Sequence, residues 1–585
     1  MRRGSGWWGR AVVLWAVSQV GADPPGAFNS DDGAMVARDS VLAHDGTRLP
    51  TRRARGTSLA GWARAVVVPT LITVWCLHPL LRPGYILQID AVFGPRAPLS
   101  LGGFGAPISL LTHLLGGGLA GRLYLAGTLF LCAFGPMVLL RSRSWLAQIP
   151  AGLLGALNPW VYQRLIEGQC GVAAALGFLF LWLAAWDALQ ARPRWRRSAI
   201  CALAGWAAVV VDQHAIGMLL VLAGASLLWN RAWRNRPWLI WGAASFLILG
   251  AMLLYALPPF FLGHSNGSYY AVQHFGRADL VEFRATASAR YGLWPNLIGL
   301  YGFWAERLGR IPSLKAGALW WPVATSALVA LAIVGAFVRR GRAWLLPVGV
   351  LGLLLAGSTA TGVGQNVFLW LMERLPLVGA YREPEKWSDL WLIALVVLGA
   401  EAVSWLASRR APLWAGELAV PVALVMVAAT LFPAGVGVLR EVPATVLPVQ
   451  YPLGWIQTAA YMQAHVPSQD QVVVLPWTLY EELPFTGNLL TANPASVVLP
   501  GRLISPNDLQ IPGALTEARS PGNLASVAIF PNLKSCDLQK TLLKLGVHWA
   551  IVEPASGGAA DAAALLGCGF RLRSGSLPGL VLLQG

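Results

Sequence analysis

Long apolar runs separated by short polar stretches make up the middle of the 585-residue chain. A run of about 20 apolar residues is long enough for one helix to cross the roughly 30 Å of hydrocarbon in a bilayer. We assign eleven such runs, at 61–81, 121–140, 145–163, 171–190, 198–211, 215–229, 237–257, 318–338, 343–360, 388–407 and 413–433. The pattern predicts an α-helical polytopic membrane domain with about eleven transmembrane helices over residues 59–434.

Two segments decide this count. Residues 198–229 can form one long helix, but the polar "VDQH" (211–214) interrupts them, and we interpret them as two short helices. The segment 104–121 is nearly long enough to cross, yet its glycine-rich end favours a helix that lies at the membrane interface.

Short clusters of arginine fall between the apolar runs. They lie at Arg141 and Arg143, and within 192–197, 230–236, 339–342 and 409–410. Because cytoplasmic loops of membrane proteins collect Lys and Arg, we place these clusters inside. An odd number of crossings then leaves the N-terminus in the cytoplasm and the C-terminus outside, in a multi-pass protein of the plasma membrane.

The two ends of the chain differ from its middle. Residues 1–58 are polar and rich in arginine, and they predict a disordered cytoplasmic tail. A short apolar piece at 11–22 has the size of a signal peptide, and cleavage after it is the alternative. Residues 435–585 lack long apolar runs and predict an extracytoplasmic α/β domain, with strands at 471–477 and 548–553.

Two of the six cysteines, Cys536 and Cys568, lie in this C-terminal domain. An oxidising compartment allows them to form a disulfide, and two unpaired thiols are the alternative.

The amino-acid composition agrees with the membrane assignment and limits the classes of partner to be expected. With 56% hydrophobic and 12% charged residues, the chain cannot fold as a soluble globule without exposing a very large apolar surface. A net charge of +17 raises nucleic acid as a partner. Because the arginines cluster between apolar runs, we attribute them to membrane topology and expect membrane lipids, not nucleic acid, as partners.

Acidic and histidine residues of the membrane domain gather in the loops predicted to lie outside. A site that needs carboxylates can therefore be built only on that face. Three stretches there carry unusual polar residues: "YILQIDAVFGP" (85–95), "NPWVYQRLIEGQ" (158–169) and "YREPEKW" (381–387). The first places Asp90 among apolar neighbours, where partial desolvation would raise the pKa of its carboxyl and make it a better proton acceptor.

The other two stretches supply cations and further carboxylates. The second contains Arg164, Glu167 and Gln169, and the third offers Arg382 and Lys386 to a phosphate and Glu383 and Glu385 to a sugar or a metal. Each stretch also has a structural interpretation: a helix-capping aspartate, an i,i+3 salt bridge and a charged helix start.

Two histidines lie in other outer loops. His214, in the break between two predicted helices, can bind a sugar or a lipid phosphate, or be structural. The long loop 258–317 holds Tyr269, Tyr270 and His274, which suit carbohydrate contacts because aromatic faces pack on sugar rings. The alternative is that this loop only covers the membrane site.

Taken together, these stretches resemble the type C (GT-C) glycosyltransferases, polytopic enzymes that use polyprenyl-phosphate sugars on the outer face of the membrane. More narrowly, the chain is similar to a group of large, poorly characterised bacterial and archaeal membrane proteins in that superfamily. The likeness covers about residues 84–555. Its specific stretches are "GYILQIDAVFGP", "NPWVYQRLIEGQCG", "YREPEKW", "VVLPWTLYEE" and "KLGVHWAIVE".

The resemblance implies an inverting transfer of a sugar from a polyprenyl-phosphate donor to a glycan, lipid or protein of the cell envelope. Asp90 would be the general base, and the lipid phosphate would be bound by Arg382, Lys386 and Arg164. The substrate-binding candidates are Glu167, Gln169, His214, Glu383, Glu385 and His274. Some members of the superfamily use a divalent cation such as Mg²⁺ or Mn²⁺. Since Asp90 is the single carboxylate of its stretch, we expect no tightly bound metal.

Two other functions remain open at the level of sequence. A transporter or flippase of an envelope lipid or polymer usually places ionisable residues within its spans and often contains internal repeats. A non-catalytic membrane protein of envelope assembly would retain the fold without the chemistry.

Overall fold

The computed structural model describes residues 59–100, 103–262, 272, 275–315, 321–375, 377–408, 416–506, 536–575 and 579–585. The predicted N-terminal tail 1–58 and His274 lie outside these residues.

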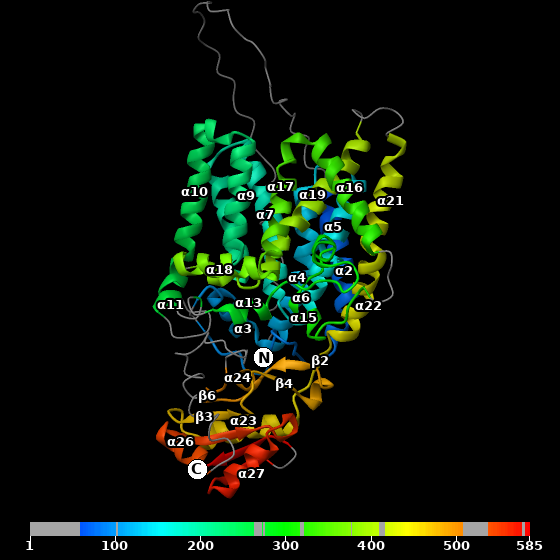
Figure 1. Cartoon of the computed structure of the whole chain (residues 1–585). Helices are drawn as coiled ribbons and strands as arrows, with labels where there is room; N and C mark the ends of the chain where they lie inside the picture. The colour runs from blue at the N-terminus through cyan, green and yellow to red at the C-terminus, as the bar shows by residue number, and fades with distance from the viewer. Residues whose placement is uncertain are drawn as a thin grey trace, which may run out of the picture. The chain divides into compact units, whose positions relative to one another are not determined.

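Seven helical segments in the described part of the chain are long and apolar enough to cross a membrane. Each coincides with a predicted crossing, and Figure 1 shows their helices running alongside one another. Their helices are α2 (Leu59–Leu77), α4 (Gly117–Leu139), α7 (Cys170–Ala191), α10 (Arg236–Leu253), α16 (Trp321–Val338), α17 (Leu345–Ala356) and α19 (Ser388–Leu406). The chain is a multi-pass membrane protein.

The remaining predicted crossings fall on shorter helices, so a count of eleven is not confirmed. These helices are α5 (Trp145–Ala156), α8 (Trp195–Val211), α9 (Ala215–Trp229) and α21 (Ala419–Thr430). The break between α8 and α9 lies at residues 212–214, as predicted. The segment 104–121 contains α3 (Ala106–Leu115), which is too short to cross and ends before α4 begins.

The predicted run 145–163 is wrong as a single helix. The chain leaves α5 at Ala156, and α6 (Pro159–Glu167) follows as a separate short helix. The Asn158 side chain caps α6 by accepting a hydrogen bond from the Val161 amide at 3.0 Å, and proline at the first helical position has no amide hydrogen to leave unpaired.

Helix α19 is the core of the membrane domain. It is apolar on nearly all sides and is buried along almost its whole length, as expected of a helix surrounded by others. Its closest contact is with α16 at Gly335, where a Cβ atom would come within 1.9 Å of the Leu398 carbonyl oxygen. Only glycine permits this approach.

The last turns of α19 carry a buried ion cluster, which we call the Glu401 cluster. The Glu401 carboxylate pairs with Arg143 at 2.5 Å, Arg342 at 3.1 Å and Arg339 at 3.2 Å. Arg342 also reaches Asp187 at 2.5 Å. Arginines from two of the clusters used to predict topology thus meet on one carboxylate.

The C-terminal domain contains a five-stranded sheet in the order β6-β3-β7-β9-β8. Strand β3 (Gln471–Leu475) is parallel to β6 (Arg502–Ile504) and β7 (Val547–Val552), whereas β9 (Val581–Gln584) is antiparallel to β7 and to β8 (Arg571–Gly575). Both predicted strands are neighbours in this sheet. The sheet packs with α23 (Leu453–His465), α26 (Asp537–Lys544) and α27 (Ala559–Gly567). Cys536 and Cys568 form a disulfide.

In Figure 1 the short helices α3, α6 and α15 (Trp304–Arg307) lie between the long helices and this sheet. In this layer of short helices, the loop that follows α2 reaches the C-terminal domain. Its strand β1 (Tyr85–Ile86) pairs antiparallel with β2 (Pro448–Val449).

Candidate active site

The loop that carries Asp90 is fixed on two sides by backbone hydrogen bonds. On the side of the membrane helices, the Asp90 amide donates to the Glu167 carbonyl oxygen at 2.8 Å. On the side of the C-terminal domain, the Ala492 amide donates to the Ile89 carbonyl oxygen at 2.9 Å. Gly168, with φ of +86°, lies so close that a Cβ atom there would be 2.6 Å from the Ala91 nitrogen. The backbone around Asp90 is therefore held in one place.

The Asp90 carboxylate accepts one hydrogen bond on each oxygen. The Tyr480 hydroxyl donates to Oδ1 at 2.8 Å, and Gln169 Nε2 donates to Oδ2 at 3.1 Å. The side chain is exposed to solvent, yet protein surrounds the opening in which it lies. This partial desolvation raises the pKa of the Asp90 carboxyl, and the two hydrogen bonds oppose that rise. Asp90 is thus accessible and more basic than an ordinary aspartate.

Arg164 is buried behind Gln169 and is 0% exposed. Its guanidinium donates to Gln169 Oε1 and to Glu385 Oε1, the latter at 2.9 Å, and stacks over Phe303 with its carbon 3.9 Å from the ring centre. Because Gln169 Oε1 is occupied by Arg164, the amide nitrogen of Gln169 is directed at Asp90. Arg164 and Glu385 therefore orient Gln169 from inside the protein.

Glu167 is fully buried beside Asp90. Within the described residues neither of its carboxylate oxygens has a hydrogen-bond partner, and its nearest cation is Arg310 at 3.8 Å. Burial, and next the charge of Asp90, raise the pKa of Glu167 to about 8. At neutral pH Glu167 is mostly protonated, so Glu167 itself does not place a full negative charge beside Asp90.

The stretch 381–387 brings further charges to the site. Lys386 is buried and lies 3.5 Å from Glu383. Burial would raise the pKa of Glu383, but Lys386 and Arg382 lower it to about 2. Arg382 itself packs over the rings of Phe275 and Phe283, with its guanidinium carbon 4.0 Å and 4.7 Å from their centres.

His214 links the break after α8 to this stretch. Its Nδ1 lies 2.6 Å from Asp212 Oδ1 and its Nε2 lies 2.5 Å from the Ala380 carbonyl oxygen. Both ring nitrogens thus face oxygen acceptors, and only the protonated imidazolium can donate to both. Burial opposes ionisation of Asp212, but His214 holds the pKa of that carboxyl well below its usual range. Both ring nitrogens of His214 are thus engaged by oxygen atoms of the protein.

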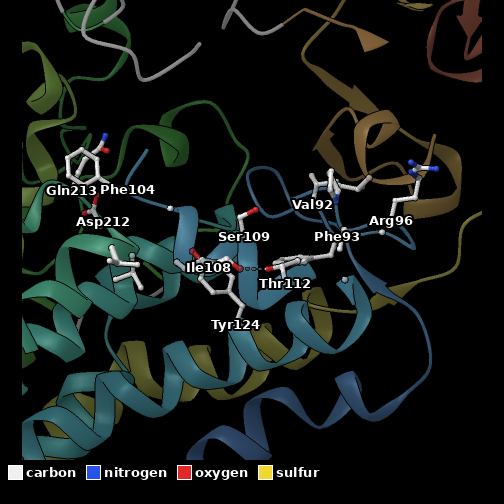
Figure 2. Close-up of a pocket in the computed structure, with 18 of the residues that line it drawn as sticks. Val92, Phe93, Arg96, Phe104, Ile108, Ser109, Thr112, Tyr124, Asp212 and Gln213 are labelled. Carbon is white, nitrogen blue, oxygen red and sulfur yellow. Dashed lines mark hydrogen bonds between the residues drawn. The ribbon is translucent and has the colours of Figure 1, made fainter. Parts of the chain in front are cut away.

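A cavity of about 620 Å³ opens next to these groups (Figure 2). Most of its wall is apolar, whereas its polar groups come from Arg96, Ser109, Thr112, Asp212, Gln213, His214 and Lys386, of which Arg96 is an exposed cation and Lys386 a buried one. The apolar lining includes Val92, Phe93, Phe104, Ile108, Tyr124, Val210 and Val211. The cavity therefore combines a long apolar surface with a buried cation. Arg382 and Arg164 are not among its described lining residues.

Tyr480 and Arg310 are site residues that sequence analysis missed. In the sequence Tyr480 belongs to the stretch "VVLPWTLYEE" of the C-terminal domain and Arg310 to the long loop 258–317, and neither position indicates a contact near Asp90. The Arg310 guanidinium carbon lies 5.3 Å from the centre of the Tyr480 ring and 5.4 Å from that of Trp304. Tyr480 is 390 positions from Asp90, and no local pattern reports such a contact.

Among the side chains that the structure describes, no three His, Cys, Asp or Glu residues come together in a way that could hold a metal ion.

The bundle with its outer short helices and small C-terminal sheet domain has the GT-C fold of membrane glycosyltransferases. The chain is similar to the cryo-EM structure of arabinofuranosyltransferase AftD from mycobacteria, with 16% identity and a TM-score of 0.55, over 89% of this chain and 39% of that chain. For a mutant of AftD the identity is 16% and the TM-score is 0.53, over 89% of this chain and 41% of that chain.

The chain thus spans about two fifths of AftD. ArnT from Cupriavidus metallidurans in the apo state gives 14% identity and a TM-score of 0.45, over 90% of this chain and 98% of that chain. No family model and no curated protein matches the chain.

Proposed function

We propose that this protein is an inverting glycosyltransferase that transfers a sugar from a polyprenyl-phosphate donor to a glycan, lipid or protein of the cell envelope. The fold it shares with AftD, whose name states arabinofuranosyl transfer, supports a sugar-transfer reaction in the membrane. The observation that carries the proposal is the Asp90 carboxylate, which is open to solvent, is held by two donors and interacts electrostatically with Lys386, the buried lysine in the mostly apolar wall of the cavity.

Asp90 is the general base of this proposal. A carboxylate has about four lone-pair positions, so two remain after Tyr480 and Gln169 have donated. Asp90 accepts the proton of the acceptor hydroxyl as that oxygen attacks the anomeric carbon. The bond between this carbon and the phosphate oxygen breaks on the opposite face, and the lipid phosphate leaves with the electron pair.

The cavity is the proposed donor site. Its apolar wall suits the first isoprene units of a polyprenyl chain, and Lys386 is our candidate for the phosphate because it is the buried cation of the lining. Arg382 can bind the phosphate only if its guanidinium moves away from the rings of Phe275 and Phe283. Arg164 does not bind the phosphate in this proposal; it orients Gln169, which donates to Asp90. We assign Glu167 and Glu383 to the polar surroundings of the reacting sugar.

The proposed orientation places Asp90 and the C-terminal domain outside the cell and the Glu401 cluster at the cytoplasmic end. The Cys536–Cys568 disulfide supports this, because disulfides persist in oxidising compartments. Arginine enrichment at the opposite end of α19 agrees with it. No metal ion is part of the proposal, because Asp90 is the single carboxylate of its stretch.

The test is sugar transfer by purified Asp90→Asn protein in lipid nanodiscs, with a panel of polyprenyl-phosphate sugars. We expect kcat to fall by about 100-fold or more, the contribution of a general base. Glu482→Gln, an exposed acid two positions from Tyr480, is the matched control and should transfer normally. Full activity of Asp90→Asn would remove Asp90 as the base. Parallel assays with EDTA and with Mg²⁺ or Mn²⁺ test the absence of a metal requirement.

A further inference from the structure

The C-terminal domain reaches Asp90 through a small two-stranded sheet. Strand β4 (Tyr480–Glu482) pairs antiparallel with β5 (Leu490–Ala492), so that Tyr480 lies opposite Ala492. The Ala492 amide in turn donates to the Ile89 carbonyl oxygen, one residue before Asp90. The strand that carries Tyr480 is thus tied by two steps to the backbone that carries Asp90.

The Tyr480 ring is held on its other side as well. Arg310 lies over the ring, and Trp304 holds the same guanidinium. Burial, and next the charge of Asp90, raise the pKa of Tyr480 far above its usual range. The phenol therefore stays protonated at every physiological pH, and in its contact with the Asp90 carboxylate it is always the donor.

We propose that Tyr480 is a positioning residue of the catalytic centre, whose hydroxyl fixes the Asp90 carboxylate in the orientation that leaves a free lone pair for the acceptor. The inference rests on the proposed function, in which Asp90 is the base. It makes the C-terminal domain a part of the reaction centre in addition to any role in binding the acceptor.

Several charged or titratable groups face Asp90 besides Tyr480. They are Glu167 and Cys170 around the end of α6, Glu383 and Lys386 from the stretch 381–387, and Arg310, which acts through Glu167 and Tyr480. None of these groups donates a hydrogen bond to the Asp90 carboxylate in the described structure; only the neutral donors Tyr480 and Gln169 do. Removing the Tyr480 hydroxyl therefore withdraws half of the hydrogen bonds that stabilise the ionised form.

The experiment compares Tyr480→Phe with wild type. Phenylalanine keeps the ring under Arg310 and removes only the hydroxyl, so the pKa of Asp90 should rise by about one pH unit, the usual weight of one hydrogen bond to a charged group. Difference infrared titration of each protein against its Asp90→Asn counterpart reads this value directly and needs no activity. Tyr461→Phe, which removes a hydroxyl from α23 of the same domain, is the matched control and should leave the titration unchanged.

Activity supplies a second reading. The acid limb of the pH profile of kcat should move to higher pH in Tyr480→Phe by the same amount, while KM for the donor stays within about twofold. Replacement Tyr480→3-fluorotyrosine, which keeps the shape and strengthens the donor, should shift both readings the opposite way, and it serves as the readout if Tyr480→Phe folds poorly. An Asp90 titration that is the same in wild type and both variants would overturn the inference. Absence of transfer in wild type would overturn the proposed function alone.

Discussion

Replacing Glu167 with glutamine is expected to change how the stability of the protein depends on pH. Glu167 is buried, its two oxygens lack hydrogen-bond partners within the described residues, and its pKa is raised from an ordinary 4.5 to about 8. A carboxyl whose pKa is raised on folding stabilises the folded state only while it is protonated. That stabilisation is complete below the unfolded pKa and is lost as the pH rises through the folded one.

The size of the effect follows from these two values. Each pH unit between the unfolded and folded pKa is worth about 1.4 kcal/mol, which gives wild type a loss of about 4 kcal/mol between about pH 5 and pH 9. Glu167→Gln has no proton to lose at this position and is isosteric. Its advantage over wild type should therefore be small at about pH 5 and should grow towards about pH 9.

The assay is thermal unfolding of both proteins in the same detergent across this pH range. Other ionisable groups titrate in both proteins, so the difference in Tm between them isolates Glu167. A difference that stays flat with pH, or that favours wild type at high pH, would refute the assignment of a protonated Glu167 beside Asp90.

Two further perturbations address the membrane domain and the donor site. Glu401→Gln leaves three half-buried arginines without their shared, buried carboxylate and should destabilise the protein by about 3 kcal/mol, seen as a lower Tm, whereas exposed Glu373→Gln should not. Equal Tm values for both variants would show that the cluster is not a stabilising element. Lys386→Met removes the buried cation of the cavity and should lower kcat/KM for the donor about 30-fold, the weight of one charged contact to phosphate, while exposed Lys540→Met leaves it unchanged. An unchanged kcat/KM in Lys386→Met would show that the phosphate of the donor does not bind at Lys386.

The fold was predictable where a single physical requirement dominates. Crossing a bilayer demands a long apolar run, and such runs are visible without any knowledge of packing. The ends of the shorter helices were harder to predict, because a break such as residues 212–214, or the helix start at Asn158, depends on one or two polar residues. The parallel pairing of β3 with β7 could not be predicted, since about 75 residues separate them and no local pattern encodes the pairing.

In the candidate site, too, some features could be predicted from the sequence and others could not. Asp90, Gln169 and Glu383 were identified because polar residues are rare in an apolar chain. Their roles were not accessible, because whether Arg164 faces a substrate or Gln169 depends on the Phe303 ring that covers it. The contact between Tyr480 and Asp90 could not be predicted, because the two residues belong to different domains.

The pairing of β1 with β2 has a consequence for how the protein is made. Tyr85 is synthesised early, whereas its partner Val449 is synthesised more than 360 residues later. The loop that carries Asp90 therefore lacks its hydrogen bonds to the C-terminal domain during most of translation, and a nascent chain that stops before this domain contains Asp90 without the Tyr480 hydroxyl that contacts it. The complete Asp90 environment thus forms only after the C-terminal domain has been synthesised.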